Sequence, residues 1–88
     1  MKIYLGKKMF IVENGNVNHF FKYKDVKKTD VKGNRLIIIV KNRIITVNKG
    51  KDNLERVNDV LRSVTIHNEG PDQQMVYEVA HVTIGKFL

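Results

Sequence analysis

Short runs of apolar residues alternate with polar, turn-forming residues through the first half of the chain. The clearest turn signal is Asn14-Gly15, which stands between β-rich runs at 8–13 and 16–23. An Asn-Gly pair in this setting favours a type I′ turn, because both central residues of that turn have positive φ. The pattern therefore predicts a hairpin, and the short run Lys2–Leu5 is expected to add a further strand.

Three more strands are predicted after the hairpin. The segment 25–31 alternates less cleanly and contains two adjacent lysines, so we expect an edge strand with a bulge. A turn at 33–34 leads into the run 35–41. This run is continuously apolar and β-branched, so the strand is apolar on both faces and is expected at the centre of a sheet. A tight turn at 41–43 precedes the last strand, 44–47. Together these segments predict an antiparallel β-meander of five or six short strands.

The spacing of the apolar residues changes after Gly50, from two to three or four. One stripe results, and it contains Leu54, Val57, Val60, Leu61 and Val64. This spacing predicts an amphipathic helix at about 52–64 that packs its apolar face on the sheet. Asp52 is expected to cap the first turn, with Glu55 completing a capping box.

Residues 71–84 admit two interpretations. Pro71 suits the first turn of a second helix, in which Met75 and the nearby valines would share one face. The same residues also alternate as in a strand. The helix is favoured, the strand remains the alternative, and the preceding segment 67–71 is expected to act as a hinge. The apolar pair 87–88 would either enter the core or form an exposed anchor for another subunit.

The predicted architecture is a single α+β domain over residues 1–88. An aromatic strand with an Asp-Val step is followed by two β-branched strands and a helix, in the segments 20–26, 36–40, 44–47 and 54–64. This order resembles the short bacterial versions of the pleckstrin-homology-like domain. The resemblance implies a scaffold that binds proteins, peptides or occasionally lipid headgroups, and it implies no enzyme. That family usually has seven strands before its helix and does not usually continue through a segment like Pro71–Leu88.

Length and composition place the chain among small globular domains. Its 88 residues suffice for one hydrophobic core, and 42% of them are apolar. The longest apolar run, Leu36–Val40, is far shorter than the roughly 20 residues of a membrane-spanning helix. The N-terminus shows no signal-peptide pattern, so we expect an intracellular, cytoplasmic protein. The absence of cysteine excludes disulfides, thiol nucleophiles and zinc sites with Cys ligands.

No set of residues has the spacing that a catalytic or metal site requires. His19, His67 and His81 are far apart and show no paired spacing for a metal. Ser63 is the only serine and has no Gly-rich elbow around it. The carboxylates are scattered, and the isolated glycines form no phosphate-binding loop. The sequence therefore predicts a protein that is not an enzyme, without cofactor, metal or small-molecule substrate.

Positive charge exceeds negative charge, with 16 Lys and Arg against 9 Asp and Glu and a net charge of +7. This balance favours an anionic partner. A composition rich in Lys, Asn and Ile is also typical of low-GC genomes, as in a small bacterial or phage accessory protein. The candidate anion or nucleic-acid contacts lie on a Lys-rich ribbon at 22–35; they are Lys22, Lys24, Lys27, Lys28, Lys32 and Arg35. Tyr23 is the candidate for base stacking, with core packing as the alternative for this ring and for Phe21.

The predicted turns divide this charge. In the meander, turns at 32–35 and 49–51 are expected at one end of the sheet, with those at 14–16 and 41–43 at the other. A groove that tracks phosphates would need the cations gathered in one place.

Three functions compete. The leading hypothesis is a non-catalytic binding module for another protein or for itself, through an exposed strand edge or the 71–88 segment. The alternative is nucleic-acid binding through the 22–35 ribbon. Attachment to an anionic membrane surface through the same lysines ranks third, and no lipidation motif supports it.

Overall fold

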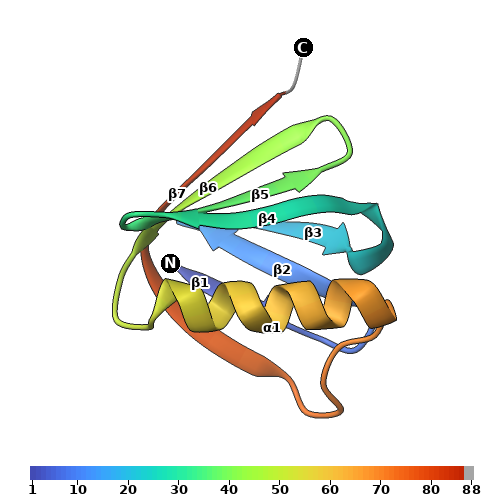
Figure 1. Cartoon of the computed structure of the whole chain (residues 1–88). Helices are drawn as coiled ribbons and strands as arrows, with labels where there is room; N and C mark the ends of the chain where they lie inside the picture. The colour runs from blue at the N-terminus through green and yellow to red at the C-terminus, as the bar shows by residue number, and fades with distance from the viewer. Residues whose placement is uncertain (87–88) are drawn as a thin grey trace.

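The computed structural model describes residues 1–86, in which six short strands precede one helix and a longer strand follows it (Figure 1). The elements are β1 (Lys2–Leu5), β2 (Met9–Asn14), β3 (Val17–Lys22), the 3-10 turn η1 (Tyr23–Asp25), β4 (Val26–Lys32), β5 (Arg35–Val40), β6 (Arg43–Lys49), α1 (Leu54–His67) and β7 (Met75–Lys86). The predicted antiparallel meander packed against a helix is confirmed. The two placements considered for 87–88 concern residues outside the described range. Within that range no helix is long and apolar enough to cross a bilayer.

The seven strands form one sheet with the order β3-β2-β1-β7-β6-β5-β4. Residues 75–78 of β7 pair with β1, and residues 79–86 pair with β6. Near the start of the second part, Ala80 and His81 are both exposed and the register with β6 shifts, as expected of a bulge that bends a strand. The two halves of the sheet fold toward each other about this bend, and α1 covers the side between them (Figure 1).

The favoured prediction of a second helix at 71–84 is wrong, and the strand alternative is correct. Tyr77, Val79 and Val82 are buried, whereas the residues between them are exposed. A strand at this place gains backbone partners from β1 and then from β6, which would both lose those partners if the segment were helical. Pairing between segments distant in sequence therefore decides the conformation of β7.

The core lies between α1 and the concave face of the sheet. Its buried strand residues come from β1, β2, β5, β6 and β7. The strand β5 buries only one face, because Leu36, Ile38 and Val40 are inside while Ile37 and Ile39 remain partly exposed. The expectation of a strand inside the sheet agrees with its pairing to β4 on one side and β6 on the other. Within residues 1–86 the apolar residues of its convex face carry no second layer.

The first hairpin turn differs from its predicted type. Asn14 is the last residue of β2, and the two turn residues are Gly15 and Asn16. Gly15 has φ +66°, and within residues 1–86 neither asparagine is among the residues with positive φ. A type I′ turn centred on Asn14-Gly15 is therefore wrong, although the hairpin itself is confirmed. A single glycine at the first turn position suffices to reverse the chain.

Helix α1 begins and ends later than the predicted 52–64. Its N-cap is Asn53, whose side chain accepts hydrogen bonds from the N–H groups of Glu55 and Arg56. Asp52 is not the cap, because its carboxylate accepts from the N–H of Glu78 at 2.6 Å and ties the start of the helix to β7. At the C-terminus Asn68 has φ +53° and closes a Schellman motif, in which Glu69 N–H donates to Val64 O at 3.1 Å.

The segment 67–71, predicted as a hinge, is docked against the turn between β1 and β2. Gly70 N–H donates to Lys7 O at 2.7 Å, and the carbonyl of Gly6 accepts from the Tyr23 hydroxyl at 2.7 Å. A Cβ atom on Gly70 would lie 1.9 Å from that carbonyl oxygen. Backbone contact thus fixes the path from α1 into β7.

Candidate functional site: the open edges of the sheet

Residues 75–78 of β7 pair only with β1, and their other edge is bonded at Glu78 by Asp52. Three further stretches of strand have one edge without a strand partner inside the described range. β3 pairs only with β2, and β4 pairs only with β5. The third stretch is 80–86 of β7, which pairs only with β6. An open edge presents unpaired N–H and C=O groups and is a template for another extended segment.

The edge of β4 presents the backbone of Thr29 and Val31. The two-residue turn Gly33-Asn34 joins β4 to β5, so the residues that flank it, Lys32 and Arg35, form a hydrogen-bonded pair. Counting back from Lys32, every second residue of β4 directs its backbone toward β5. Thr29 and Val31 therefore direct their N–H and C=O groups outward. Val31 N–H donates to the Asp30 carboxylate at 2.9 Å, whereas the groups of Thr29 face the space beside the strand. The predicted bulge is confirmed, between Val26 and Lys28.

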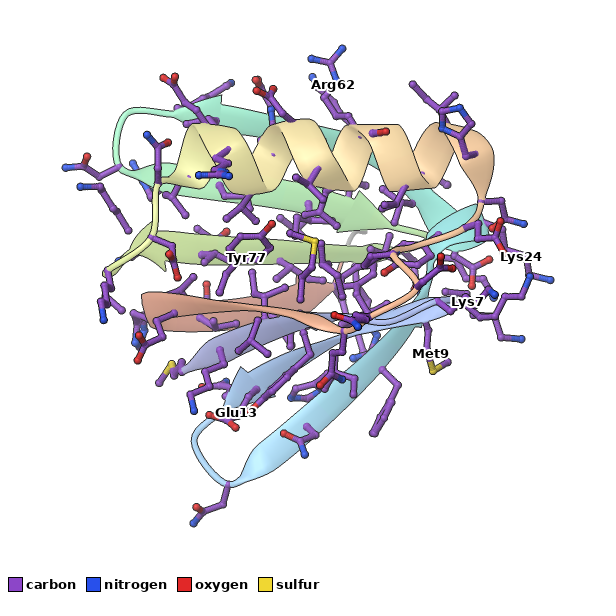
Figure 2. The ribbon with its side chains drawn as sticks, turned by 90° about the horizontal axis from the view of Figure 1, so that it is seen from below. Lys7, Met9, Glu13, Lys24, Arg62 and Tyr77 are labelled. Atoms are coloured by element: carbon purple, nitrogen blue, oxygen red, sulfur yellow. The ribbon has the colours of Figure 1, made fainter. Side chains whose placement is uncertain are left out.

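Helix α1, with Arg62 on its outer side (Figure 2), packs beside β4. A groove of about 470 Å³ lies between the helix and this edge. The lining residues are Val26, Lys27, Lys28, Thr29, Asp30, Arg62, Thr65 and Ile66. Three of them are cations and Asp30 is the one carboxylate, so the groove is electropositive. Ile66 is 78% exposed and offers an apolar contact at the helix side.

The buried polar atoms without a hydrogen-bond partner also belong to α1 and β4. Among the described residues these atoms are Thr29 Oγ1, Asn58 Oδ1 and Thr65 Oγ1. Asn58 is 9% exposed, and it is the only buried polar residue within residues 1–86. Helical spacing places Asn58 on the same face as Arg62 and Thr65, which line the groove. An unpaired buried polar group costs about 1–3 kcal/mol, so the fold concentrates this penalty along one seam.

The edge of β3 borders a second groove, of about 560 Å³, on the side of the β5–β6 turn. Phe20 is 59% exposed there, and His19, Lys22 and Arg43 line the same groove. Lys41 in the turn lies 3.6 Å from the Asp25 carboxylate, which is therefore already engaged.

The six predicted anion contacts are all exposed but are not gathered at one site. Lys22 lines the β3 groove, and Lys27 and Lys28 line the β4 groove. Lys24 lies in η1, at the same end of the molecule as Lys7 in Figure 2. The remaining two, Lys32 and Arg35, form a cross-strand pair at the opposite end of β4.

The turns lie differently from the expected division. The η1 turn adds one reversal of the chain, so the turn at 14–16 lies at the same end as 32–35 and not with 41–43 (Figure 1). That shared end includes the link at 49–53, where Lys49 N–H donates to Asn34 O at 2.8 Å.

Tyr23 is 0% exposed, which removes the free ring face that stacking on a base would need. Its ring stacks on Phe10 with centroids 5.7 Å apart, and Phe21 packs on Phe10 at 5.4 Å. Both rings thus adopt the core-packing alternative. Burial raises the pKa of Tyr23 to about 12. The exposed aromatic residue of β3 is Phe20, which points to the face opposite that of Phe21, the neighbouring residue considered from the sequence.

The histidines occupy separate elements, with His19 on β3, His67 at the end of α1 and His81 on β7. The ring nitrogen Nδ1 of His67 lies 2.8 Å from Ser63 O. Within residues 1–86 no group of three or more His, Cys, Asp or Glu side chains is placed to hold a metal ion. No family model, curated protein or solved structure matches the chain.

Proposed function

We propose that this protein is a non-catalytic protein-interaction module that binds an extended, acidic segment of a partner along β4. The observation that carries this function is the seam between β4 and α1. Backbone groups on an open edge border the groove there, and Thr29 and Thr65 line it with buried hydroxyl groups that have no hydrogen-bond partner within residues 1–86. An added strand supplies hydrogen-bonding groups that match the N–H and C=O of Thr29 and the C=O of Val31, whose N–H is bonded to Asp30.

The positive charge of the groove between β4 and α1 favours an acidic partner. Lys27, Lys28 and Arg62 outnumber the single carboxylate of Asp30, which is held by Val31 N–H. Lysines and a bulge on an edge strand discourage pairing with a second basic strand. An acidic segment gains attraction from the same lysines, and charge complementarity also speeds its association.

The side chains of a bound strand would alternate between two surroundings. On the convex face they meet Lys28 and Lys32 of β4, with Asp30 between the two lysines. On the other face they meet Ile66 and Val26. The groove therefore fits alternating acidic and apolar residues. Single cross-strand pairs contribute about 0.2–1 kcal/mol, so several act together in a weak, reversible complex.

The test uses fluorescein-labelled peptides of about eight residues, the length of an ordinary strand. One alternates Glu with Val and its control alternates Lys with Val. Fluorescence anisotropy is expected to show binding of the Glu peptide alone. Binding should weaken as salt rises from about 50 to 200 mM.

Two variants locate the contact. Thr29→Pro removes the outward N–H of the edge and is expected to abolish binding, whereas Thr29→Ser retains that N–H and the hydroxyl and is expected to bind as the parent does. Circular dichroism checks that both variants fold. Equal binding by the two variants, or by the two peptides, would contradict an acidic strand on β4.

A second candidate function is nucleic-acid binding in the β3 groove. It is favoured by Phe20, an exposed aromatic ring beside Lys22 and Arg43. An electrophoretic shift with single-stranded DNA, titrated over salt, tests it. Phe20→Ala should weaken the shift, and reversing the charges of Lys22 and Arg43 should remove it. No shift at low salt would exclude this function.

A further inference from the structure

The C-terminal half of β7, residues 80–86, has an open edge that binding along β4 does not use. The pairing of β1 with β7 reaches Glu78, and Val79 N–H donates to Met1 O at 3.0 Å. From Ala80 onward the described residues supply a strand partner on one side only, which is β6. Figure 1 shows this part of β7 at the border of the molecule, with no ribbon on its outer side.

The outward backbone groups of this edge belong to Val82 and Ile84. A two-residue turn joins β5 to β6, so the pair that flanks it is hydrogen-bonded. Because hydrogen-bonded and non-hydrogen-bonded pairs alternate along β6, the backbone groups of Thr46 point away from β5 and toward Thr83 of β7. Every second residue of β7 counted from Thr83 is bonded to β6 in the same way. The N–H and C=O groups of Val82 and Ile84 point away from β6.

Charge distinguishes the outward part of this edge from the other two edges. The edge of β4 carries lysines beside α1, and β3 borders a groove with Lys22 and Arg43. The bulge of β7 lies at Ala80 and His81, before the outward groups of Val82 and Ile84. Residues 80–85 include no lysine, arginine or carboxylate, and Val82, Thr83 and Ile84 are β-branched. A neutral, β-branched edge is a template for strand pairing.

We infer that a second copy of this chain pairs with this edge, antiparallel about a twofold axis at Thr83. Val82 then lies opposite Ile84 of the second copy, which keeps both side chains on the concave face. Lys86 lies opposite Ala80 of the second copy, so the two lysines stay at opposite ends of the new pair. The contact is isologous and closed, and it joins β4-β5-β6-β7 of each copy into one continuous sheet.

The second copy fits better than a charged partner because the edge itself is neutral. Each copy carries a net charge of +7, so the approach of two copies is opposed by repulsion that salt screens. Dimerisation should therefore strengthen as salt rises. Peptide binding along β4 has the opposite salt dependence, which separates the two contacts.

The test compares Ile84→Pro with Ile84→Ala in the whole chain. Both variants lose the isoleucine side chain, but only proline loses the outward N–H, and neither loses a hydrogen bond to β6. Sedimentation equilibrium from about 10 μM to 1 mM covers the range of weak complexes. The parent chain and Ile84→Ala are expected to double in mass within this range, while Ile84→Pro stays monomeric. Thermal unfolding confirms that both variants fold.

Amide hydrogen exchange identifies the residues that form the dimer contact. Protection of the Ile84 amide should increase with protein concentration, whereas the Thr83 amide, bonded to β6, should be protected at every concentration. A parent chain that is monomeric up to about 1 mM, or equal dimerisation of the two variants, would overturn pairing through β7. Thr29→Pro is expected to leave the dimer unchanged, so failure of peptide binding and failure of dimerisation remain distinguishable.

Discussion

Single residues show how burial redirects groups that the sequence offers for binding. Tyr23 has an aromatic ring within a Lys-rich ribbon, yet its ring is sealed against Phe10 and its hydroxyl donates to Gly6 O. Alternation along β3 places Tyr23 on the same face as Phe21, and both rings pack on Phe10. Alternation could not reveal that this face is the covered one for Tyr23, because its hydroxyl bonds to a turn distant in sequence.

Tyr23 also makes stability depend on alkaline pH. The neutral hydroxyl is favoured in the folded chain, where its pKa is about 12, against 10.0 for an exposed tyrosine. Its contribution is complete below pH 10 and declines as pH rises toward 12, by up to about 1.4 kcal/mol per pH unit.

Tyr23→Phe removes both this titration and the hydrogen bond to Gly6 O. We expect the variant to lose about 1 kcal/mol at pH 7 and to show a shallower decline between pH 10 and 12. Urea unfolding across this pH range measures the two slopes. Identical slopes would show that Tyr23 does not titrate with unfolding.

Asn58 shows the reverse case, a polar residue in an apolar stripe. Positions 54, 57, 58 and 61 follow helical spacing, and only Asn58 among them is polar. A polar residue within the apolar stripe is the one feature of the sequence that points to this side of the helix. Thr29 and Thr65 gave no such signal, because their burial depends on α1 lying beside β4.

Asn58→Leu should stabilise the chain by about 1 kcal/mol, because an apolar group replaces an unpaired buried oxygen. The same variant should bind the Glu-Val peptide more weakly than the parent. Thermal unfolding and anisotropy measure the two effects, and Thr65→Val provides a near-isosteric comparison. A destabilised Asn58→Leu would show that Oδ1 has a partner in solution.

At the scale of elements, strands joined by tight turns and the amphipathic helix were predictable. Each is encoded by spacing within a few residues. The helix termini and β7 were not, because Asp52 bonds to Glu78 and β7 is held by β1 and β6. Those partners are far away in sequence. The sequence alone points to Lys27 and Lys28, but the groove that they line depends on the position of α1.

The bend of β7 rests on close approach to the link before α1. A Cβ on Gly50 would lie 2.6 Å from the backbone carbon of Val79, whereas a Cβ on Gly85 meets nothing within 4 Å. Gly50→Ala should therefore cost about 2–3 kcal/mol, and Gly85→Ala should change stability by less than about 0.5 kcal/mol. Chemical denaturation of both variants tests this, and similar stabilities would mean that the link can move away from β7.

At the scale of the whole molecule, the arrangement is a bent sheet whose open edges differ in chemistry. One edge is basic and lies beside a helix, one borders a groove with an exposed phenylalanine, and one is neutral. Net charge alone did not separate these surfaces, since it sums cations that lie at both ends of the molecule. The separation supports distinct partners for distinct edges.

Amide chemical-shift mapping with the Glu-Val peptide tests the central proposal most directly. Titration into the ¹⁵N-labelled chain should shift the amides of 26–32 in β4 and of 58–66 in α1, with the Thr29 amide gaining protection from exchange. The amides of β3 and of 80–86 should stay unchanged. Shifts confined to the β3 groove, or none at saturating peptide, would contradict binding along β4.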